Sequence, residues 1–187
     1  MAFRFAKTVQ RNAGEPSAFL KTHRTPNQKG SHMLSVELDK GDVKGFMGKL
    51  LREGFFDDFE ARSVEIMGRN RVAIDGAIEN AGEESDDDKT KQGFSTWGEL
   101  RPLAYEIIKS GAKPSFVKIV FSHQNPANVH PNAAALFINM VYENDCVTFT
   151  TATSQREFAL NKSVDDVWSD SVQRFFSESG IHVRERE

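Results

Sequence analysis

The segment that most constrains the fold is 115–122, which reads Ser-Phe-Val-Lys-Ile-Val-Phe-Ser. A strand this uniformly apolar is typical of the middle of a sheet, where both faces are covered. Three more strand patterns follow in quick succession, at about 135–143, 146–152 and 156–160. Because the connections between them are too short for parallel crossovers, we predict an antiparallel meander.

Helical spacing of apolar residues occurs in three other segments. The first follows an N-cap residue at Asp42 and stops at Gly54, and the second covers about 97–110. The third starts at the cap residue Ser163 and stops at Gly180. Each has one apolar stripe, so each is predicted to pack against a sheet face.

The remaining strand patterns are short and alternate apolar with polar residues. They lie at 34–38, 60–67 and 71–79, and the last two read as a hairpin. The predicted order is therefore β-α-β-β-α-β-β-β-β-α. This order indicates an α+β domain, with a mainly antiparallel sheet and about three helices packed on it.

Two polar segments flank or interrupt this pattern. Residues 80–93 hold five acids within six positions and no large apolar side chain, so we predict a solvated acidic loop within a single domain at 33–187. Residues 1–32 hold six Lys and Arg against one Glu, a net charge of +5, whereas 33–187 carries 18 basic and 26 acidic residues, a net charge of −8. We predict that 1–32 is a disordered basic arm.

Four residues at the end of the arm indicate where the arm comes from. Gly30-Ser31-His32-Met33 matches the tetrapeptide that remains when a purification tag is removed, and Met33 opens the first patterned segment. Residues 1–32 are therefore expected to be vector-derived or an upstream extension. The arm lacks the apolar segment of a secretory signal. No apolar run in the sequence is long enough to span a membrane, and the single Cys cannot form an internal disulfide. We expect a cytoplasmic protein with no membrane partner.

Several stretches together resemble a known family. They are Trp97–Leu103, Ile107–Gly111 before Pro114, Phe116–Phe121, Thr150–Ser154 and Asp166–Trp168. Over about 33–181 the chain resembles an uncharacterised family of small bacterial proteins, a domain of unknown function found mainly in Gram-positive anaerobes. The resemblance implies no activity and no catalytic residue. Ala152 stands where the family tends to have Gly. The turn that the resemblance implies at Thr150–Ser154 is therefore expected to have a different geometry in this chain.

The sequence lacks the common motifs of catalysis and cofactor binding. The chain has no Gly-x-Gly-x-x-Gly, Walker-type loop, His-Glu-x-x-His or Gly-x-Ser-x-Gly, so we predict no cofactor and no catalytic residue. His123 and His130 lie in one loop, but as metal ligands they need a third donor, so exposed loop histidines are the expected outcome and no metal is predicted. Cys146 has no neighbouring base, and a buried thiol is the usual finding in a strand.

Four residues are candidates for binding: Arg101, Trp97, His123 and His130. Arg101 opens a helix and could clamp an anion, but pairing with a carboxylate such as Glu99 or Asp75 is expected first. Trp97 and Trp168 stand at helical spacing with apolar residues, so we expect core positions ahead of ligand stacking.

Three functions fit these observations. The leading hypothesis is a noncatalytic protein-binding or scaffold module, because an adequate core comes with no recognisable catalytic set. One alternative is a nucleic-acid-associated factor, with clamp-like topology and phosphate contacts from the basic arm. The other alternative is an enzyme whose site is assembled from scattered Asp, His and Arg.

Overall fold

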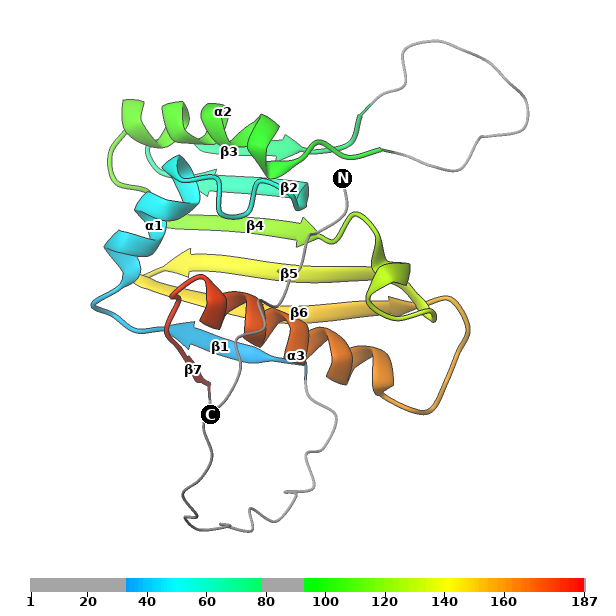
Figure 1. Cartoon of the computed structure of the whole chain (residues 1–187). Coiled ribbons are helices and arrows are strands. Elements are labelled where there is room, and N and C mark those ends of the chain that lie inside the picture. Colours follow the sequence, from blue (N-terminus) through cyan, green and yellow to red (C-terminus); the bar gives the residue numbers. More distant parts are fainter. Residues whose placement is uncertain (1–32, 79–92, 187) are drawn as a thin grey trace, which may run out of the picture.

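The computed structural model describes residues 33–78 and 93–186, and Figure 1 shows a sheet with helices packed against it. The elements follow in the order β1 (Ser35–Leu38), α1 (Val43–Arg52), β2 (Glu60–Met67), β3 (Arg71–Asp75), α2 (Trp97–Ser110), β4 (Phe116–Ser122), the 3-10 helix η1 (Pro126–Asn128), β5 (Ala133–Glu143), β6 (Cys146–Gln155), α3 (Ser163–Glu178) and β7 (Val183–Glu185). The basic arm and nearly all of the acidic segment lie outside the described residues.

The sheet of the described residues has seven strands in the order β3-β2-β4-β5-β6-β1-β7. Every neighbouring pair is antiparallel, and β4, β5 and β6 follow one another as the predicted meander. The predicted α+β class, with a mainly antiparallel sheet and three helices, is confirmed.

All three helices cover the same face of the sheet. Ile119, Met140 and Phe149 are register partners across β4, β5 and β6, and all are buried. Phe46 of α1 meets Phe149 with ring centroids 5.4 Å apart, and Phe176 of α3 meets the same ring at 4.8 Å. Strand alternation therefore sends every second side chain into one core under the helices.

Aromatic rings connect the middle of this core. Phe56, in the segment after α1, stacks on Phe121 of β4 with centroids 4.5 Å apart. Phe55 stacks on Phe175 of α3 at 4.8 Å, and Trp97 meets Phe121 edge-on at 5.7 Å. Such ring pairs add to the free energy that burial of their area contributes. The segment after α1 thus ties all three helices to the sheet.

Helix α2 has the predicted bounds, Trp97 to Ser110. The Glu99 carboxylate accepts a hydrogen bond from the Thr96 backbone N–H at 2.8 Å, as in a capping box. Helix α1 also starts as predicted, with Asp42 as its N-cap residue, although the Asp42 side chain makes no cap hydrogen bond. The start of α3 differs from the prediction: Lys162 is the N-cap residue, it makes no side-chain cap hydrogen bond, and Ser163 is already the first residue of the helix.

The hairpin β2–β3 is shorter than predicted, because β3 ends at Asp75. Gly76 packs so closely on β2 that a Cβ there would lie 1.7 Å from the carbonyl oxygen of Ala61. A short segment, 93–96, which we call the strap, lies beside Gly76 and β2. Ser95 donates its backbone N–H to Gly76 O at 2.8 Å, and Ala61 of β2 donates its N–H to Ser95 O at 2.9 Å. The strap therefore leads directly into α2.

The end of the sheet differs most from the prediction. Residues 153–155, which separate the strands predicted at 146–152 and 156–160, are the last part of β6. The strand predicted at 156–160 is wrong, since this segment is a loop. The additional strand, β7, comes after α3 and pairs with β1. The order of the last elements is therefore β6, loop, α3 and β7.

Candidate functional site

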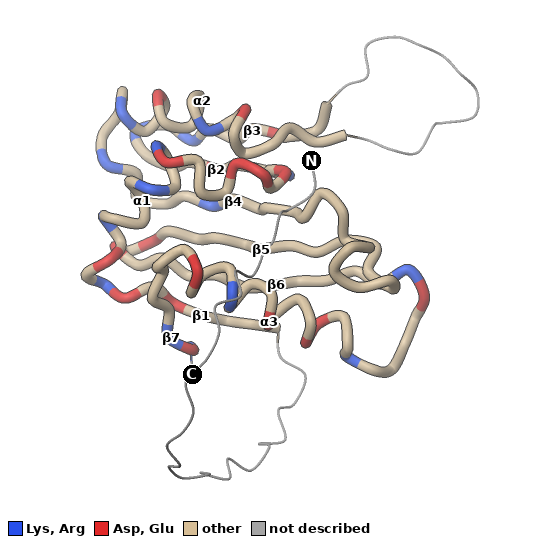
Figure 2. Tube along the Cα trace, in the orientation of Figure 1, with Lys and Arg blue, Asp and Glu red and all other residues tan. Residues whose placement is uncertain are grey.

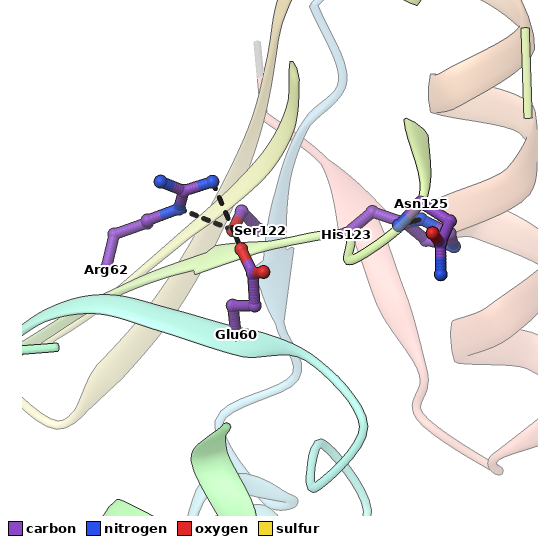
Figure 3. Close-up of polar contacts among 5 residues, drawn as sticks. All are labelled: Glu60, Arg62, Ser122, His123 and Asn125. Atoms are coloured by element: carbon purple, nitrogen blue, oxygen red, sulfur yellow. Dashed lines mark hydrogen bonds and ion pairs between the residues drawn. The ribbon is translucent and has the colours of Figure 1, made fainter. Parts of the chain in front are cut away.

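A cluster of charged and polar side chains lies on the open face of the sheet, opposite the helices. Ser122 ends β4, and because side chains alternate along a strand, it points away from the core that its neighbour Phe121 enters. Figure 3 shows Glu60 and Arg62 of β2 meeting this hydroxyl. We call these three residues the Ser122 cluster.

The hydroxyl of the Ser122 cluster is occupied on both sides. Ser122 Oγ donates to Glu60 Oε2 at 2.7 Å and accepts from Arg62 Nε at 2.7 Å. Arg62 Nη2 also lies 3.1 Å from Glu60 Oε2, which closes the triangle. Only 1% of Ser122 is exposed, so the hydroxyl acts here as a link between two strands.

A bulge in β2 places Arg62 in this cluster. The register with β4 shifts between Ala61 and Ser63, which leaves Arg62 as the extra residue. Its guanidinium carbon lies 3.5 Å from the centroid of the Phe94 ring, a cation–π contact. Phe94 belongs to the strap 93–96, so the Ser122 cluster also fixes the chain that enters α2.

His123 follows the cluster and starts the loop toward η1. Its Nδ1 accepts the backbone N–H of Asn125 at 3.1 Å, and its ring meets Phe59 and Trp168 edge-on at 6.3 and 5.9 Å. Burial lowers the pKa of His123, while the charge of Glu60 acts in the opposite direction. His123 is therefore a packed, half-buried histidine and not the exposed one that was expected.

His130, at the other end of the same loop, has different neighbours. Its Nδ1 accepts the backbone N–H of Asn132 at 3.1 Å, and its Nε2 lies 3.2 Å from Ser163 Oγ. The structure thus engages each loop histidine separately. Within 33–78 and 93–186, no three His, Cys, Asp or Glu side chains form a group that could hold a metal ion.

Arg101 pairs with a carboxylate, as expected, but its partner is Asp57 and neither Glu99 nor Asp75. The contact is bidentate: Nε donates to Oδ1 and Nη2 to Oδ2, both at 2.9 Å. Two glycines make room for this carboxylate. A Cβ at Gly54 would lie 2.7 Å from Asp57 Oδ2, and one at Gly98 would lie 3.2 Å from Asp57 Cβ.

Trp97 occupies the core position expected for it, with 0% of its surface exposed. Its Nε1 donates to the carbonyl of Leu50 at 3.0 Å, which ties α2 to α1. Trp168 is buried too, and its Nε1 donates to Phe137 O at 2.9 Å. Cys146, by contrast, is only half-buried. The pKa of its thiol is raised mainly by burial and, to a smaller extent, by the neighbouring Glu37.

The most exposed large apolar side chains of the described residues are neighbours in the loop between β6 and α3. Phe158 is 90% exposed and Leu160 is 88% exposed. We call residues 156–162 the apolar loop. Sequence reasoning missed it, because the alternation of Phe158 and Leu160 with small or polar residues is also the signature of a half-buried strand.

Hydrogen bonds at its base hold the apolar loop in place. The side chain of Asn132 bonds both backbone groups of Glu157, and the N–H of Arg156 donates to the carbonyl of Asn132 at 2.9 Å. Arg156 Nε donates to Ala133 O at 3.1 Å, and the N–H of Ala159 donates to Gln155 Oε1 at 3.1 Å. The two apolar side chains are therefore displayed on a fixed backbone.

The fold and these sites define an α+β domain in which three helices cover one face of an antiparallel sheet. The chain belongs to a family of unknown function (DUF5721), whose model matches residues 49–184, and this confirms the resemblance to a family without an assigned activity. No curated protein and no solved structure matches the chain. None of the described helices has the length and apolarity that crossing a membrane requires.

Proposed function

We propose that the chain is a noncatalytic protein-binding module whose contact element is the apolar loop. The observation that carries this proposal is the exposure of Phe158 and Leu160, 90% and 88%, two positions apart in one loop. Removal of a Phe or Leu side chain from water contributes roughly 1.5–3 kcal/mol when the side chain becomes fully buried. Two such anchors would supply much of the binding energy of a small interface.

The fixed backbone of the apolar loop supports the same proposal. A partner that binds a mobile loop must offset the entropy lost when the loop becomes ordered. Here Asn132 and Gln155 already hold the backbone on both sides of Phe158. More of the burial energy therefore remains for affinity.

The hydrogen bonding of the Ser122 cluster favours a structural role for it. Its hydroxyl, carboxylate and guanidinium are engaged with one another, and Arg62 also lies against Phe94. This arrangement joins β2, β4 and the strap, and so supports the sheet edge that carries α2. Ligand binding by Arg101, Trp97, His123 or His130 stays a prediction.

The two alternatives from sequence stay predictions as well. Phosphate contacts would depend on the basic arm, which lies outside the described residues. An assembled enzyme site would need Arg101 and a loop histidine to act together, whereas the guanidinium of Arg101 is paired with the carboxylate of Asp57. We further propose a bacterial cytoplasmic location, as the resemblance and the single Cys suggest.

Site-specific photocrosslinking tests the proposed function. A photoreactive phenylalanine analogue replaces Leu160 in the full chain, and the same analogue replaces Leu103 of α2, which is 51% exposed, as the matched control. Any protein captured only from position 160 is purified and titrated with the wild-type chain and with the double variant Phe158→Ser/Leu160→Ser.

The proposal predicts a defined adduct at position 160 and a loss of affinity of about tenfold or more in the double variant. Circular dichroism and thermal unfolding of that variant should match those of the wild-type chain, because both side chains are exposed. Equal capture from both positions, or unchanged affinity of the double variant, would overturn the proposal.

A further inference from the structure

An apolar groove lies at the far end of the strands from the apolar loop. It encloses about 400 Å³ between the β2–β3 turn and the C-terminal end of α2. Its apolar lining comes from Ile66, Val72, Ile107, Ile108, Ala112 and Pro114. In Figure 1 the β2–β3 turn and the end of α2 lie at the left, and the loop between β6 and α3 lies at the right. The molecule therefore has an apolar projection at one end and an apolar recess at the other.

The two ends also differ in charge. Arg69 is the charged residue among those that line the groove, and its lining includes no Asp or Glu. Segments 66–72 and 107–114 hold three further Lys and Arg, and Glu65 and Glu106 directly precede these segments. Figure 2 shows basic positions around the end of α2 and the chain that leads into β4. Segment 156–170, which holds the apolar loop and the first half of α3, carries four acids against one Arg and one Lys, a net charge of −2.

One cation of the groove is available to a partner. Three of the four pair with acids outside these segments, as Arg71 does with Glu65 at 2.8 Å. Arg69, in the lining, is exposed and forms no ion pair with any residue that the structure describes. An acidic flank beside an apolar anchor would complement this end in both charge and apolarity.

We propose that the occupant of the groove is a second copy of this chain, which inserts Phe158 and Leu160 of its apolar loop. This inference rests on the proposed function, since it uses the same contact element and names its partner. The contact is heterologous, because the loop of one copy meets the groove of the next. Such contacts form closed rings or open filaments, according to the rotation between copies.

Sedimentation velocity of the full chain over a range of concentrations tests this assembly. The loop variant is Phe158→Ser/Leu160→Ser, and the groove variant is Ala112→Glu, which places a carboxylate in the groove at an exposed position. The wild-type chain should grow in mass with concentration. Each variant alone should raise the dissociation constant about tenfold or more.

A mixture of the two variants is the decisive test. The loop variant keeps an intact groove and the groove variant keeps an intact loop, so an equimolar mixture can form one good contact and then stop. We expect a heterodimer of one copy each and no larger species. A mixture that stays monomeric, or a wild-type chain that stays monomeric at every concentration, would overturn the head-to-tail assembly.

The outcomes separate this inference from the proposed function. If the wild-type chain stays monomeric but a different protein is captured at position 160 and lost in the loop variant, the assembly is overturned and the proposed function stands. If the chain assembles and the loop variant assembles equally well, the apolar loop is not the contact element of the assembly and this inference fails. The proposed function fails with it only if position 160 also captures no other protein.

Discussion

The side chain of Asn132 makes two hydrogen bonds to the backbone of Glu157. Its Nδ2 donates to Glu157 O at 2.9 Å, and its Oδ1 accepts the Glu157 N–H at 2.9 Å. The side-chain amide of Asn132 thus makes the two backbone hydrogen bonds that Glu157 would otherwise make with a neighbouring strand. The chain leaves the sheet here without losing its hydrogen bonds, and the next residues face the solvent.

Replacement of Asn132 should therefore loosen the apolar loop. We expect Asn132→Ala to lower the free energy of unfolding by about 1–2 kcal/mol, since two partly exposed hydrogen bonds are lost. Amide hydrogen exchange should accelerate at Glu157 and Phe158, while β5 stays protected. The control is Asn125→Ala, at an exposed position of the loop before η1. Unchanged exchange at Glu157 would contradict this role of Asn132.

Replacement of Ser122 tests the Ser122 cluster as a structural link. Ser122→Ala leaves Arg62 Nε and Glu60 without the hydroxyl that joins them, so we expect a loss of about 1–3 kcal/mol in the free energy of unfolding. Ser63→Ala, at an exposed position of β2, should have little effect. Equal stability of the two variants in urea denaturation would show that the cluster does not hold the strands together.

Two glycines of different surroundings make a further matched pair. A Cβ at Gly76 would meet the carbonyl of Ala61, whereas one at Gly48, in α1, meets nothing within 4 Å. We expect Gly76→Ala to lose more than about 4 kcal/mol or to fail to fold. Gly48→Ala should gain about 0.5–1 kcal/mol, because alanine favours a helix. Thermal unfolding measures both, and a folded Gly76→Ala chain of normal stability would contradict the packing of the strap.

The setting of His123 predicts how stability depends on pH. Burial holds the pKa of His123 below its ordinary value, so the unfolded chain binds the proton first as the pH falls. Stability contributed by the neutral ring is present above the ordinary pKa and decreases as the pH falls through roughly 7 to 5. His123→Gln should flatten this decrease, and His182→Gln, at an exposed position, should not. Parallel stability curves for all three proteins would contradict the burial of His123.

Local patterns predicted the regular part of the fold. The apolar run before Ser122 marked a central strand, and Thr96 with Glu99 marked the start of α2. These features depend on residues close together in the sequence, so propensity and periodicity suffice. The same patterns placed a strand at 156–160, which the structure shows as a loop, because long-range hydrogen bonds from Asn132 override the alternation there.

The contacts of the sites could not be predicted in the same way. Arg101 and Asp57 are 44 positions apart, and Arg62 and Ser122 are 60 apart. Their pairing follows from the sheet order and from a bulge, and neither leaves a local signal. Gly54 and Gly98 leave space beside the Asp57 carboxylate, but this role of the two glycines is visible only in the structure. The exposure of Phe158 likewise depends on the fold as a whole.

The central claim is that Phe158 and Leu160 stand in solvent, ready to contact a protein. Acrylamide quenching of a Phe158→Trp chain tests this most directly, because Trp97 and Trp168 are buried and supply a protected background. We predict that the introduced indole is quenched freely in the dilute monomer. An indole as protected as the two native ones would show that the loop packs on its own domain, and would contradict the account.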